Sequence, residues 1–576
     1  MGNSSFPKLK LLCLTLSIVV AISCNNRSVQ VTDQQNPSVS SVEKKQSLYS
    51  NLPFQMTMVE DPVFPSLEVN LKNFGAIGDG LFKNTNAFAI AIDELSSKGG
   101  GTLVVPRGIW LTGPITLKSN IRIHTEAGAL VKFSSDFDDY PLVGTSFEGL
   151  ETYRCISPVN AEGLENIAFT GEGVFDGSGD AWRPVKISKM APSNWKKLVN
   201  SGGVLSDDKR IWYPSEKSKK GDMPGNFNVP DFTRKQQFEA IKDFLRPVMV
   251  SIKNCKNVLL DGPTFQNSPA WNIHPLMSEN VIVRNCNIRN PWYAQNGDGL
   301  DLESCKNVLI YDNTFDVGDD AICFKSGKNE DGRKRGMATE NVIVNNNIVY
   351  HGHGGFVIGS EMSGGVKNVK VTNCTFIGTD VGLRFKSTRG RGGVVENIYI
   401  SDIDMVGIPA EAIRFNMFYG GNSPILEEDQ DEEDEARDEK TVPVTVETPS
   451  FKNIFMKRIR VADSKTAAMF QGLPEMNLLN VQLEDAIFEA EHGITVIDGD
   501  GLQFSNIRLK QKKGSGFTFY NTKNASLDKV VFENEKEAYV KVLGDLSNAI
   551  KLSETNADES NVEYGQGAGK QVVNFK

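Results

Sequence analysis

Three aspartates in two short segments have the spacing that acid–base chemistry needs. Asp298 lies in an Asn-Gly-Asp-Gly run that begins at Asn296, and Asp319 and Asp320 follow Gly318. If these carboxyl groups are crowded together, they cannot all ionise, so the pKa of one should rise until that group keeps its proton. A protonated carboxyl beside an ionised one is suited to general acid–base catalysis.

A histidine and a pair of cations follow the aspartates. His353 lies between glycines, and Arg384 and Lys386 are two residues apart. On a β-strand these two cations point to the same face and form a pair suited to an anionic sugar. Three carboxyl groups beside such a pair would suit hydrolysis of a glycosidic bond, because one carboxyl can donate to the leaving oxygen while another activates water. We interpret the nearby His274 and His351 as structural residues.

Each of these motifs alone has an ordinary structural explanation. Asn-Gly and Asp-Gly pairs usually form turns, and paired aspartates are usually solvated. Adjacent strand residues also face opposite ways, so Asp319 and Asp320 can serve one site only if the chain bends locally, which Gly318 would allow. A functional site is favoured because the motifs recur at one place in a repeat.

The segments that must position these residues form that repeat. An Asn-aliphatic-x-aliphatic pattern begins at residues 257, 280, 307, 341, 368 and 397. Apolar and polar residues alternate in most copies, which indicates β-strands, and no helical pattern lies between them. The repeat predicts an all-β fold, a right-handed parallel β-helix in which the Asn residues of successive coils stack as a ladder. A β-sandwich or a propeller is the alternative fold.

The candidate residues take a common place in this repeat. The three aspartates, His353, Arg384 and Lys386 lie 12 to 18 residues after the start of their own copy. Because neighbouring coils are ~4.8 Å apart, these side chains should form one column on one face of the stack.

An N-terminal helix is expected to cap the stack. Phe88, Ile92 and Leu95 have helical spacing, Asn84 lies near the start of this segment, and the triple glycine at 99–101 ends it. Such an amphipathic helix can cover the exposed edge of the first coil.

Two insertions are expected to interrupt the stack, at about 187–245 and 420–450. The first precedes the coils that carry the acids and includes Trp195, Trp212 and Tyr213. We expect these aromatic residues to stack on a sugar at one end of the site.

The chemical motifs resemble those of glycoside hydrolase family 28, the polygalacturonases. NGDG, GDD, GHG and RFK occur in the order in which the family has them, and the resemblance covers the chain from about residue 66 onward. The family usually has Thr at the position of Gly297, and this departure leaves the carboxylate untouched.

The resemblance implies the catalytic roles. Asp319 is expected to be the general acid, Asp298 and Asp320 to activate water, and His353 to tune the acid or hold the sugar. The family implies inversion of the anomeric configuration without a metal or cofactor. Inversion leads us to expect carboxyl groups roughly 6.5–9.5 Å apart.

The resemblance also implies the substrate. Arg384 and Lys386 are expected to bind a galacturonate carboxylate, and Asn296 and Tyr419 are further substrate-binding candidates. The expected reaction is hydrolysis of α-1,4-galacturonosidic linkages in pectin, either polygalacturonate or oligogalacturonides. If the insertion at 187–245 closes one end of the groove, attack will be of the exo type.

Three other functions stay open at this point. A rhamnogalacturonan or other pectin hydrolase of the same family would differ in substrate, although such members tend to lack the GHG and RxK residues. A pectate-type lyase would bind Ca²⁺, but the acidic run at 427–439 lacks the spaced Asp-Gly loop of calcium sites. A non-catalytic glycan-binding β-helix would keep the fold without the activity.

Composition and charge limit the partners. The chain has 576 residues, 39% hydrophobic and 23% charged, which disfavours disorder and a polytopic membrane protein. The net charge is −10 and most of it lies in the run at 427–439, so no nucleic-acid partner is expected. The six cysteines after residue 24 form no Cys-x-x-Cys pair. We therefore expect buried thiols rather than zinc ligands, with one or two disulfides as the alternative.

The N-terminus has the features of an export signal. Lys8 and Lys10 precede an apolar run, Leu11–Ser23, that is too short to span a bilayer. The end of this run resembles a bacterial lipobox in which Cys24 is lipidated. We expect a secretion and lipoprotein signal at 1–24, a flexible tether at 25–65 and the β-helix domain at 66–576. The protein would be exported, and it would contact a membrane of the bacterial periplasm or cell surface only through this anchor.

Overall fold

The computed structural model of the chain describes residues 41–223, 225–226, 228–419, 441–533 and 538–576. It divides into two units, residues 1–50 and 51–576. In the first unit, the described element is helix α1 (Ser41–Leu48). The predicted lipidation residue Cys24 and the acidic run at 427–439 lie outside the described residues. In the ranges that are described, no helix is long and apolar enough to cross a membrane.

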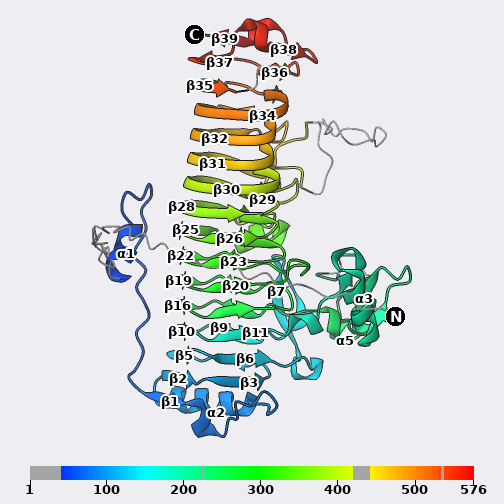
Figure 1. Cartoon of the computed structure of the whole chain (residues 1–576). Coiled ribbons are helices and arrows are strands. Elements are labelled where there is room, and N and C mark those ends of the chain that lie inside the picture. Colours follow the sequence, from blue (N-terminus) through cyan, green and yellow to red (C-terminus); the bar gives the residue numbers. More distant parts are fainter. Residues whose placement is uncertain (1–40, 224, 227, 420–440, 534–537) are drawn as a thin grey trace, which may run out of the picture. The chain divides into compact units, whose positions relative to one another are not determined.

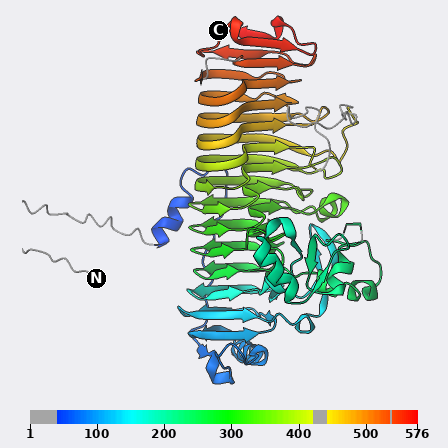
Figure 2. The ribbon, with the colours of Figure 1, turned by 45° about the vertical axis from the view of Figure 1, so that its right-hand side comes forward.

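The second unit is a right-handed parallel β-helix, as the repeat predicts (Figures 1 and 2). Each coil contributes a strand to each of three parallel ladders, which we call the first, second and third ladder. The first ladder contains β1 (Glu68–Asn70), β2 (Gly101–Val105), β5 (Ile121–Thr125), β10 (Glu165–Gly171), β16 (Lys256–Asp261), β19 (Glu279–Arg284), β22 (Lys306–Tyr311) and β25 (Thr339–Asn345). The second contains β3 (Gly108–Thr112), β6 (Ala129–Phe133), β11 (Val174–Asp176), β17 (Thr264–Gln266), β20 (Asn287–Arg289), β23 (Thr314–Asp316) and β26 (Ile348–His351).

The third ladder carries the candidate site. It contains β4 (Ile115–Thr116), β9 (Val159–Glu162), β15 (Val250–Lys253), β18 (Ile273–Leu276), β21 (Leu300–Glu303), β24 (Asp320–Lys325), β27 (Gly354–Ile358) and β29 (Val381–Lys386). Towards the C-terminus the ladders merge into long strands, β28 (Val366–Ile377), β30 (Val394–Asn416), β31 (Ser450–Gln471), β32 (Leu478–Ile497) and β34 (Gln503–Tyr520). The short strands of this region are β33 (Gly499–Asp500), which precedes β34, and β35 (Ser526–Phe532), β36 (Val540–Leu543), β37 (Ile550–Ser553), β38 (Val562–Gly565) and β39 (Val573–Phe575), which follow it.

The asparagine at the start of each repeat forms the predicted ladder. Asn307 donates to Asn280 and Asn341 donates to Asn307, at 3.4 and 3.3 Å, and the same bond joins Asn368 to Asn341 at 3.1 Å. These residues have positive φ angles of 56 to 58°. Asn tolerates this left-handed conformation better than other side chains. One residue type therefore supplies both the turn and the bond between coils.

The two faces of the third ladder explain why its sequence is unusual. In β19 of the first ladder, only the core-facing residues and their immediate neighbours are buried, whereas every residue of β21, β24 and β27 is buried. The outward-facing residues Asp301, Glu303 and Lys325 therefore have ionisable side chains that are inaccessible to solvent. Other segments must cover this face.

The predicted capping helix and core thiols are confirmed. Helix α2 (Thr85–Ser97) buries Phe88, Ile92 and Leu95 in the same hydrophobic core as the first coils. Six cysteines in the described ranges are free and buried, and they are Cys155, Cys255, Cys286, Cys305, Cys323 and Cys374.

Two segments leave the stack on the side of the third ladder. The hairpin of β7 (Leu142–Phe147) and β8 (Leu150–Cys155) is the first. The second is the predicted insertion, which lies against one side of the stack (Figure 2). Its elements are β12 (Val185–Lys186), α3 (Pro192–Asn200), β13 (Val204–Leu205), β14 (Ile211–Tyr213), α4 (Glu216–Gly221) and α5 (Lys235–Glu239), while the short helix α6 (Asn329–Arg335) follows β24.

The chain before the first coil also runs against the stack. Residues 51–65, which the sequence assigns to a tether, belong to the second unit. Asp61 accepts a hydrogen bond from Arg284 of β19 at 2.8 Å. The domain boundaries drawn from the sequence remain predictions.

Candidate active site

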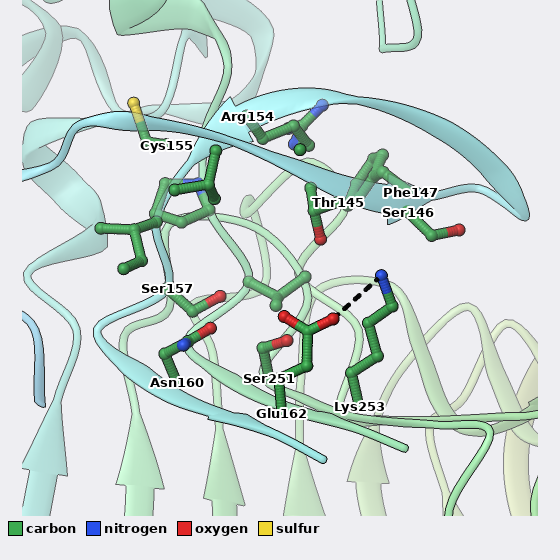
Figure 3. Close-up of a pocket in the computed structure, with 15 residues that line it drawn as sticks. Thr145, Ser146, Phe147, Arg154, Cys155, Ser157, Asn160, Glu162, Ser251 and Lys253 are labelled. Carbon is green, nitrogen blue, oxygen red and sulfur yellow. Dashed lines mark ion pairs between the residues drawn. The ribbon is translucent and has the colours of Figure 1, made fainter. Parts of the chain in front are cut away.

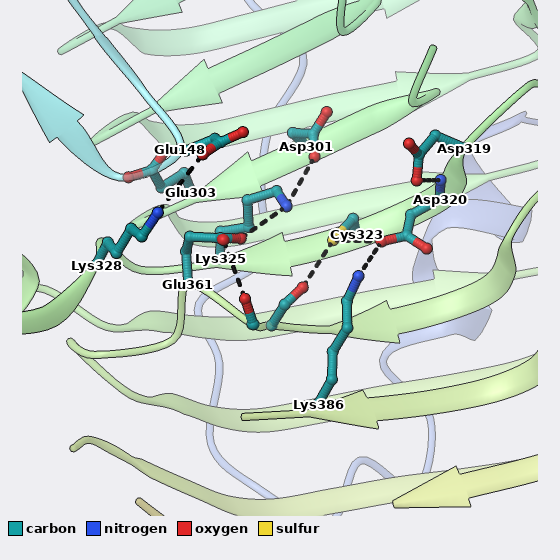
Figure 4. A network of polar contacts seen from close by, with 12 residues as sticks. Glu148, Asp301, Glu303, Asp319, Asp320, Cys323, Lys325, Lys328, Glu361 and Lys386 are labelled. Atoms are coloured by element: carbon teal, nitrogen blue, oxygen red, sulfur yellow. Dashed lines mark hydrogen bonds and ion pairs between the residues drawn. The ribbon is translucent and has the colours of Figure 1, made fainter. Parts of the chain in front are cut away.

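The three aspartates lie where coils enter the third ladder, and Figure 4 shows Asp319 and Asp320 there. Asp298 lies two residues before β21, Asp319 directly precedes β24, and Asp320 begins it. His353 directly precedes β27, and Arg384 and Lys386 lie on β29. The structure therefore brings together all six residues in the column that the repeat predicts.

Backbone hydrogen bonds between coils fix this column. The amide of Gly299 donates to the carbonyl of Asp320 at 2.9 Å, which joins the first two coils of the site. The amide of His353 donates to the carbonyl of Asp319, also at 2.9 Å, which joins the next two. The catalytic candidates are thus held by a rigid ladder rather than by loops alone.

Gly318 is required for the position of Asp319. A Cβ at residue 318 would lie 2.5 Å from the carbonyl oxygen of Pro291 and 2.8 Å from that of Ala294. The chain bends at Gly318 and Asp319 before the strand begins. This is the local bend that lets two adjacent aspartates serve one site.

The aspartate cluster, Asp298, Asp319 and Asp320, is compact. One carboxylate oxygen of each lies within 4.8 Å of the others. These oxygens are nearer than the expected separation of roughly 6.5–9.5 Å, so the spacing gives no support to inversion, which rests on the family resemblance. Three oxygens at this distance could hold a cation, and Arg384 and Lys386 already supply positive charge there. That the site needs no metal remains a prediction.

Two cations hold Asp320. Lys386 Nζ lies 2.6 Å from Asp320 Oδ2, and Arg384 Nη1 lies 3.2 Å from Oδ1. Burial alone would raise the pKa of Asp320, but Lys386, Arg384 and Lys325 hold it well below the usual range. Asp320 is therefore ionised at neutral pH.

Asp298 is in the opposite electrostatic condition. Burial, together with the charges of Asp301 and Asp319, raises the pKa of Asp298 well above the usual range. Its Oδ1 is buried and has no hydrogen-bond partner among the described residues. The expectation that one carboxyl of the cluster keeps a proton is met at Asp298, whereas the resemblance gives the acid role to Asp319. The role of each aspartate stays a prediction.

Asp319 is the most accessible member of the cluster, with 22% of its side chain exposed. His353 Nδ1 lies 3.2 Å from Asp319 Oδ1, and its Nε2 lies 3.7 Å from Asp380. The hydrogen bond to Asp319 raises the pKa of His353. The open side of the site is thus an aspartate–histidine pair that can exchange protons with a bound ligand.

Tyr419 and Asn296 are the two weaker substrate-binding candidates. Tyr419 lies beside Arg384 and Lys386, whereas Asn296 does not. The Tyr419 ring centroid is 5.1 Å from Lys386 Nζ and 5.9 Å from the Arg384 guanidinium. Asn296 instead accepts a hydrogen bond from Arg246 at 3.0 Å. His274 and His351, interpreted as structural, pair with Glu303 and Asp316.

Arg246 is a residue that the sequence does not single out. Its guanidinium also donates to the carbonyl oxygens of Gln295 and Pro269, at 2.8 and 3.0 Å. Arg246 follows the insertion directly, and it clamps the loop that leads to Asp298. Because arginine is common at structural positions, no sequence signal marks this one.

A buried charge network extends the site along the third ladder (Figure 4). Lys325 Nζ lies 3.1 Å from Glu361 and 3.5 Å from Asp301. Neither carboxylate oxygen of Asp301 has a hydrogen-bond partner among the residues described. A signal for this network exists in the sequence, because β21 and β24 carry charges at outward positions in otherwise apolar strands.

The β7–β8 hairpin and the insertion meet beside the third ladder, on the N-terminal side of the aspartate cluster. Phe147, at the hairpin tip, stacks on Trp271 with ring centroids 4.4 Å apart, and Lys325 lies 4.8 Å from the Trp271 ring. Asn228 of the insertion donates to Glu148 of the hairpin at 2.6 Å. We call the Phe147–Trp271 pair the aromatic wall.

The insertion lies beside the site, but two of its aromatic residues are not where we expect them. Trp212 and Tyr213 are buried inside the insertion, where Trp212 donates to the Gly202 carbonyl. They cannot stack on a sugar, because they form the core that a folded insertion needs. Lys189 of the insertion does reach the site loop, 5.3 Å from the exposed ring of Trp292.

Comparison with known families gives one match that covers the site. Residues 235–431 match the family described as glycosyl hydrolases family 28. This range contains every candidate residue of the site.

Curated relatives include two that align over more than half of the chain. A protein named "Probable polygalacturonase" in Vitis vinifera is 29% identical over 350 residues, which are 58% of this chain and 60% of the relative. The exo-poly-alpha-D-galacturonosidase of Dickeya chrysanthemi is 29% identical over 367 residues, 62% of this chain and 58% of the relative. The chain spans about three fifths of the length of these curated relatives.

A solved structure is more similar. The hyperthermoactive exopolygalacturonase of Thermotoga maritima is 35% identical, with a TM-score of 0.61, and the match covers 78% of this chain and 93% of that one. The family 28 exopolygalacturonase of Yersinia enterocolitica, 22% identical with a TM-score of 0.57, matches over 89% and 78% of the two chains and is a likeness of fold.

Proposed function

This chain belongs to family 28 of the glycosyl hydrolases, and on that premise we propose that it hydrolyses α-1,4-galacturonosidic linkages in polygalacturonate or oligogalacturonides. The observation that carries the proposal is the aspartate cluster, in which Lys386 lies 2.6 Å from Asp320 and keeps its pKa low, burial raises the pKa of Asp298, and Asp319 faces the open side beside His353. Acidic and basic carboxyl groups thus coexist within reach of one sugar.

The proposed reaction divides the work among the three aspartates. Asp319, on the open side, gives its proton to the glycosidic oxygen as the bond from that oxygen to the anomeric carbon breaks. A water molecule held by Asp298 and Asp320 attacks the anomeric carbon, and Asp320 accepts its proton. The protonated His353 stabilises the carboxylate that this leaves at Asp319. The proton on Asp320 then passes through solvent to Asp319, so each cycle adds one water across the bond and leaves both carboxyl groups as they began.

Arg384 supports a uronate rather than a neutral sugar as the substrate. Its guanidinium bonds Asp320 through one nitrogen, Nη1, and its side chain remains 19% exposed. A planar guanidinium has further N–H donors, which suit a carboxylate. Lys386, 5.1 Å from the Tyr419 ring, lies on the same side of the site.

We also propose that attack is of the exo type. The β7–β8 hairpin and the insertion support this, because both lie on the N-terminal side of the cluster, where Asn228 bonds Glu148, and they would leave room there for a chain end rather than a continuing polymer. The third ladder continues on the other side through β29 and β30, where the rest of the substrate would lie.

Viscosity and product analysis test both proposals. Incubation with polygalacturonate should release reducing ends as single galacturonic acid units while viscosity falls slowly. A rapid fall in viscosity at low release would mean internal cleavage and would refute exo attack alone. Release from rhamnogalacturonan but not from polygalacturonate would refute the proposed substrate.

The location of the protein is a separate proposal from the sequence. We propose that it is exported and anchored by a lipid on Cys24, which lies outside the described residues. Multiple acyl chains would hold it stably on a membrane. Cys24→Ser should move the protein from the membrane fraction to the soluble fraction with unchanged hydrolysis, and a wild-type protein found only in the soluble fraction would exclude the anchor.

A further inference from the structure

A cavity of about 100 Å³ lies under the β7–β8 hairpin, outside the active site (Figure 3). The hairpin covers it, and β9 and β15 of the third ladder form its floor. These strands are on the same face as the aspartate cluster but on earlier coils, since β15 pairs with β18 and β18 pairs with β21. We call it the hairpin cavity.

The aromatic wall separates the hairpin cavity from the active site. Phe147 lines the cavity and stacks on Trp271, and the imidazole of His274 meets Trp271 edge-on with centroids 5.1 Å apart. Lys325, which belongs to the active-site network, lies 4.8 Å from the same Trp271 ring. A ligand in the cavity would therefore not touch the aspartate cluster.

Several polar side chains that line the cavity have no hydrogen-bond partner among the described residues. The side chains of Ser157, Asn160 and Ser251 line it, and none forms a hydrogen bond with another described residue. The Ser146 hydroxyl is buried and likewise has no partner among the residues described. Of these four groups the Ser146 hydroxyl is fully buried, whereas the polar atoms of Ser157, Asn160 and Ser251 open onto the cavity, where they can bond a molecule with hydroxyl groups or water.

The rest of the lining is apolar, which favours a sugar over water alone. Val143, Phe147, Ile156, Pro247 and Val248 line the same space. A pyranose ring has an apolar face and a polar edge, and it matches a pocket with both kinds of surface. At ~10–15 Å³ per water position, the cavity of about 100 Å³ holds roughly seven to ten waters, which is the bulk of one ring and too little for an oligosaccharide.

The charges of the lining favour an anion. Arg154 is 2% exposed and has no carboxylate within 4.0 Å in the described ranges, because its guanidinium donates to the carbonyl oxygens of Arg246 and Asn228. Burial lowers the pKa of Arg154 to about 10. Lys253 pairs with Glu162 at 3.4 Å, and the Glu162 side chain is 58% exposed. The Arg154 guanidinium also lies 3.8 Å from the Phe147 ring centroid, so Lys253 is the cation of the lining that can face a ligand, while its partner Glu162 lies at the solvent side.

We propose that the hairpin cavity binds one hexuronate. Its hydroxyl groups would bond Ser157, Asn160 and Ser251, and its carboxylate would pair with Lys253. That this uronate is galacturonate, the product, rests on the proposed function. The binding itself does not, because it is measured without catalysis.

Calorimetric titration with galacturonate and with galactose tests the proposal. Ser251→Leu places a branched side chain on the cavity floor and should remove one galacturonate per molecule from the wild-type stoichiometry. Lys253→Met should weaken this binding by at least about tenfold, the usual effect of losing a charge-assisted hydrogen bond. Thr518→Leu, a matched change at a half-buried hydroxyl of the C-terminal coils, should leave it intact.

Unfolding and loss of activity are read separately. Both leucine variants should melt cooperatively and keep wild-type hydrolysis, because neither residue lies in the active site. Equal galacturonate stoichiometry in wild type and Ser251→Leu would mean that the cavity holds water only and would overturn the proposal. Equal affinity for galactose would overturn its preference for a uronate. If Ser251→Leu removes galacturonate binding but the wild-type protein cleaves no galacturonan, the proposed function is refuted and the cavity proposal stands.

Discussion

Asp320 is held by two cations, whereas Asp298 is buried with one oxygen that has no described partner, and Asp319 faces His353 on the open side. Adjacent carboxyl groups therefore have different protonation states and different structural importance. The same Asp→Asn substitution should for this reason have different effects on stability at the three positions.

Asp298→Asn, Asp319→Asn and Asp320→Asn should each lower the rate of polygalacturonate hydrolysis by about 10²–10⁴-fold, the usual contribution of an acid–base group. Asp320→Asn should also lower the melting temperature, because it leaves Lys386 buried without its anion, a loss of about 3–5 kcal/mol in comparable pairs. Initial rates and thermal melts measure both effects.

Asp316→Asn is the matched control for these variants. Asp316 lies on the neighbouring second ladder, where it pairs with His351 near the surface. It should change neither the rate nor the melting temperature appreciably. Near-normal turnover by Asp319→Asn would remove that residue as the general acid.

The pH dependence of stability should report on Asp301. Burial raises the pKa of Asp301 to about 8, although Lys325 opposes this. An unfolded aspartate ionises near pH 4. The folded state keeps a proton that the unfolded chain releases, so this group's contribution to the free energy of unfolding is full below pH 4 and is lost as pH rises towards 8.

The Asp301→Asn variant has no ionisable group at this position. It should therefore not show this loss in the free energy of unfolding as pH rises. Lys325 keeps Glu361 as its partner at 3.1 Å. Thermal melts from pH 4 to pH 8 should therefore show that the variant gains stability over wild type as pH rises. A difference between variant and wild type that shrinks as pH rises would contradict a raised pKa at Asp301.

At the residue scale, the sequence predicts those site residues that lie on or beside strands of the repeat. Asp298, Asp319, Asp320, His353, Arg384 and Lys386 are all found in one site, because strand register in a repeat converts sequence offset into position. Arg246 and Glu361 are missed, since they reach the site from loops whose path no periodicity describes.

At the scale of elements, the repeat predicts the coils and the asparagine ladder. It does so because the period of two and the left-handed turn each impose a residue type. The β7–β8 hairpin and the interior of the insertion follow no repeat. Their contacts with Trp271 and Gln295 depend on packing between segments far apart in the chain. For this reason the sequence predicts Trp212 and Tyr213 at the site, whereas both are buried inside the insertion.

Arg246 joins the insertion to the loop of Asp298, and we predict that this clamp affects catalysis. Arg246→Met should lower kcat by about 10- to 100-fold through misplacement of Asp298. It should also raise the pKa of Asp298, because a nearby positive charge is lost. The limb of the pH–rate profile that reports Asp298 should therefore move to higher pH. Arg246→Lys should restore part of both.

A matched variant distinguishes positioning from stability. Arg183→Met removes another buried guanidinium that bonds backbone and amide oxygens, at Ser268 and Asn267, but does not bond Asn296. Both methionine variants should melt earlier than wild type, while the shift in pH profile should be confined to Arg246→Met. An unchanged kcat and pH profile in Arg246→Met would mean that Arg246 is only structural.

At the scale of the whole molecule, one face of the β-helix holds three features in sequence. The hairpin cavity lies on the early coils, the aromatic wall follows, and the aspartate cluster comes next. A solenoid suits this arrangement, because each coil adds a strand of fixed spacing to a continuous face. The long strands β30 to β34 extend that face beyond Lys386, on the side where we place the remaining polymer.

The most direct test of the central claim is proton NMR of trigalacturonate during its cleavage by the wild-type protein. The aspartate cluster predicts a saturated galacturonate product, and the family predicts that it appears first as the β-anomer and then mutarotates. Addition of a chelator should leave the rate unchanged, and Asp320→Asn should abolish the signal. An unsaturated product would contradict hydrolysis altogether, and a product released first as the α-anomer would contradict direct attack by water.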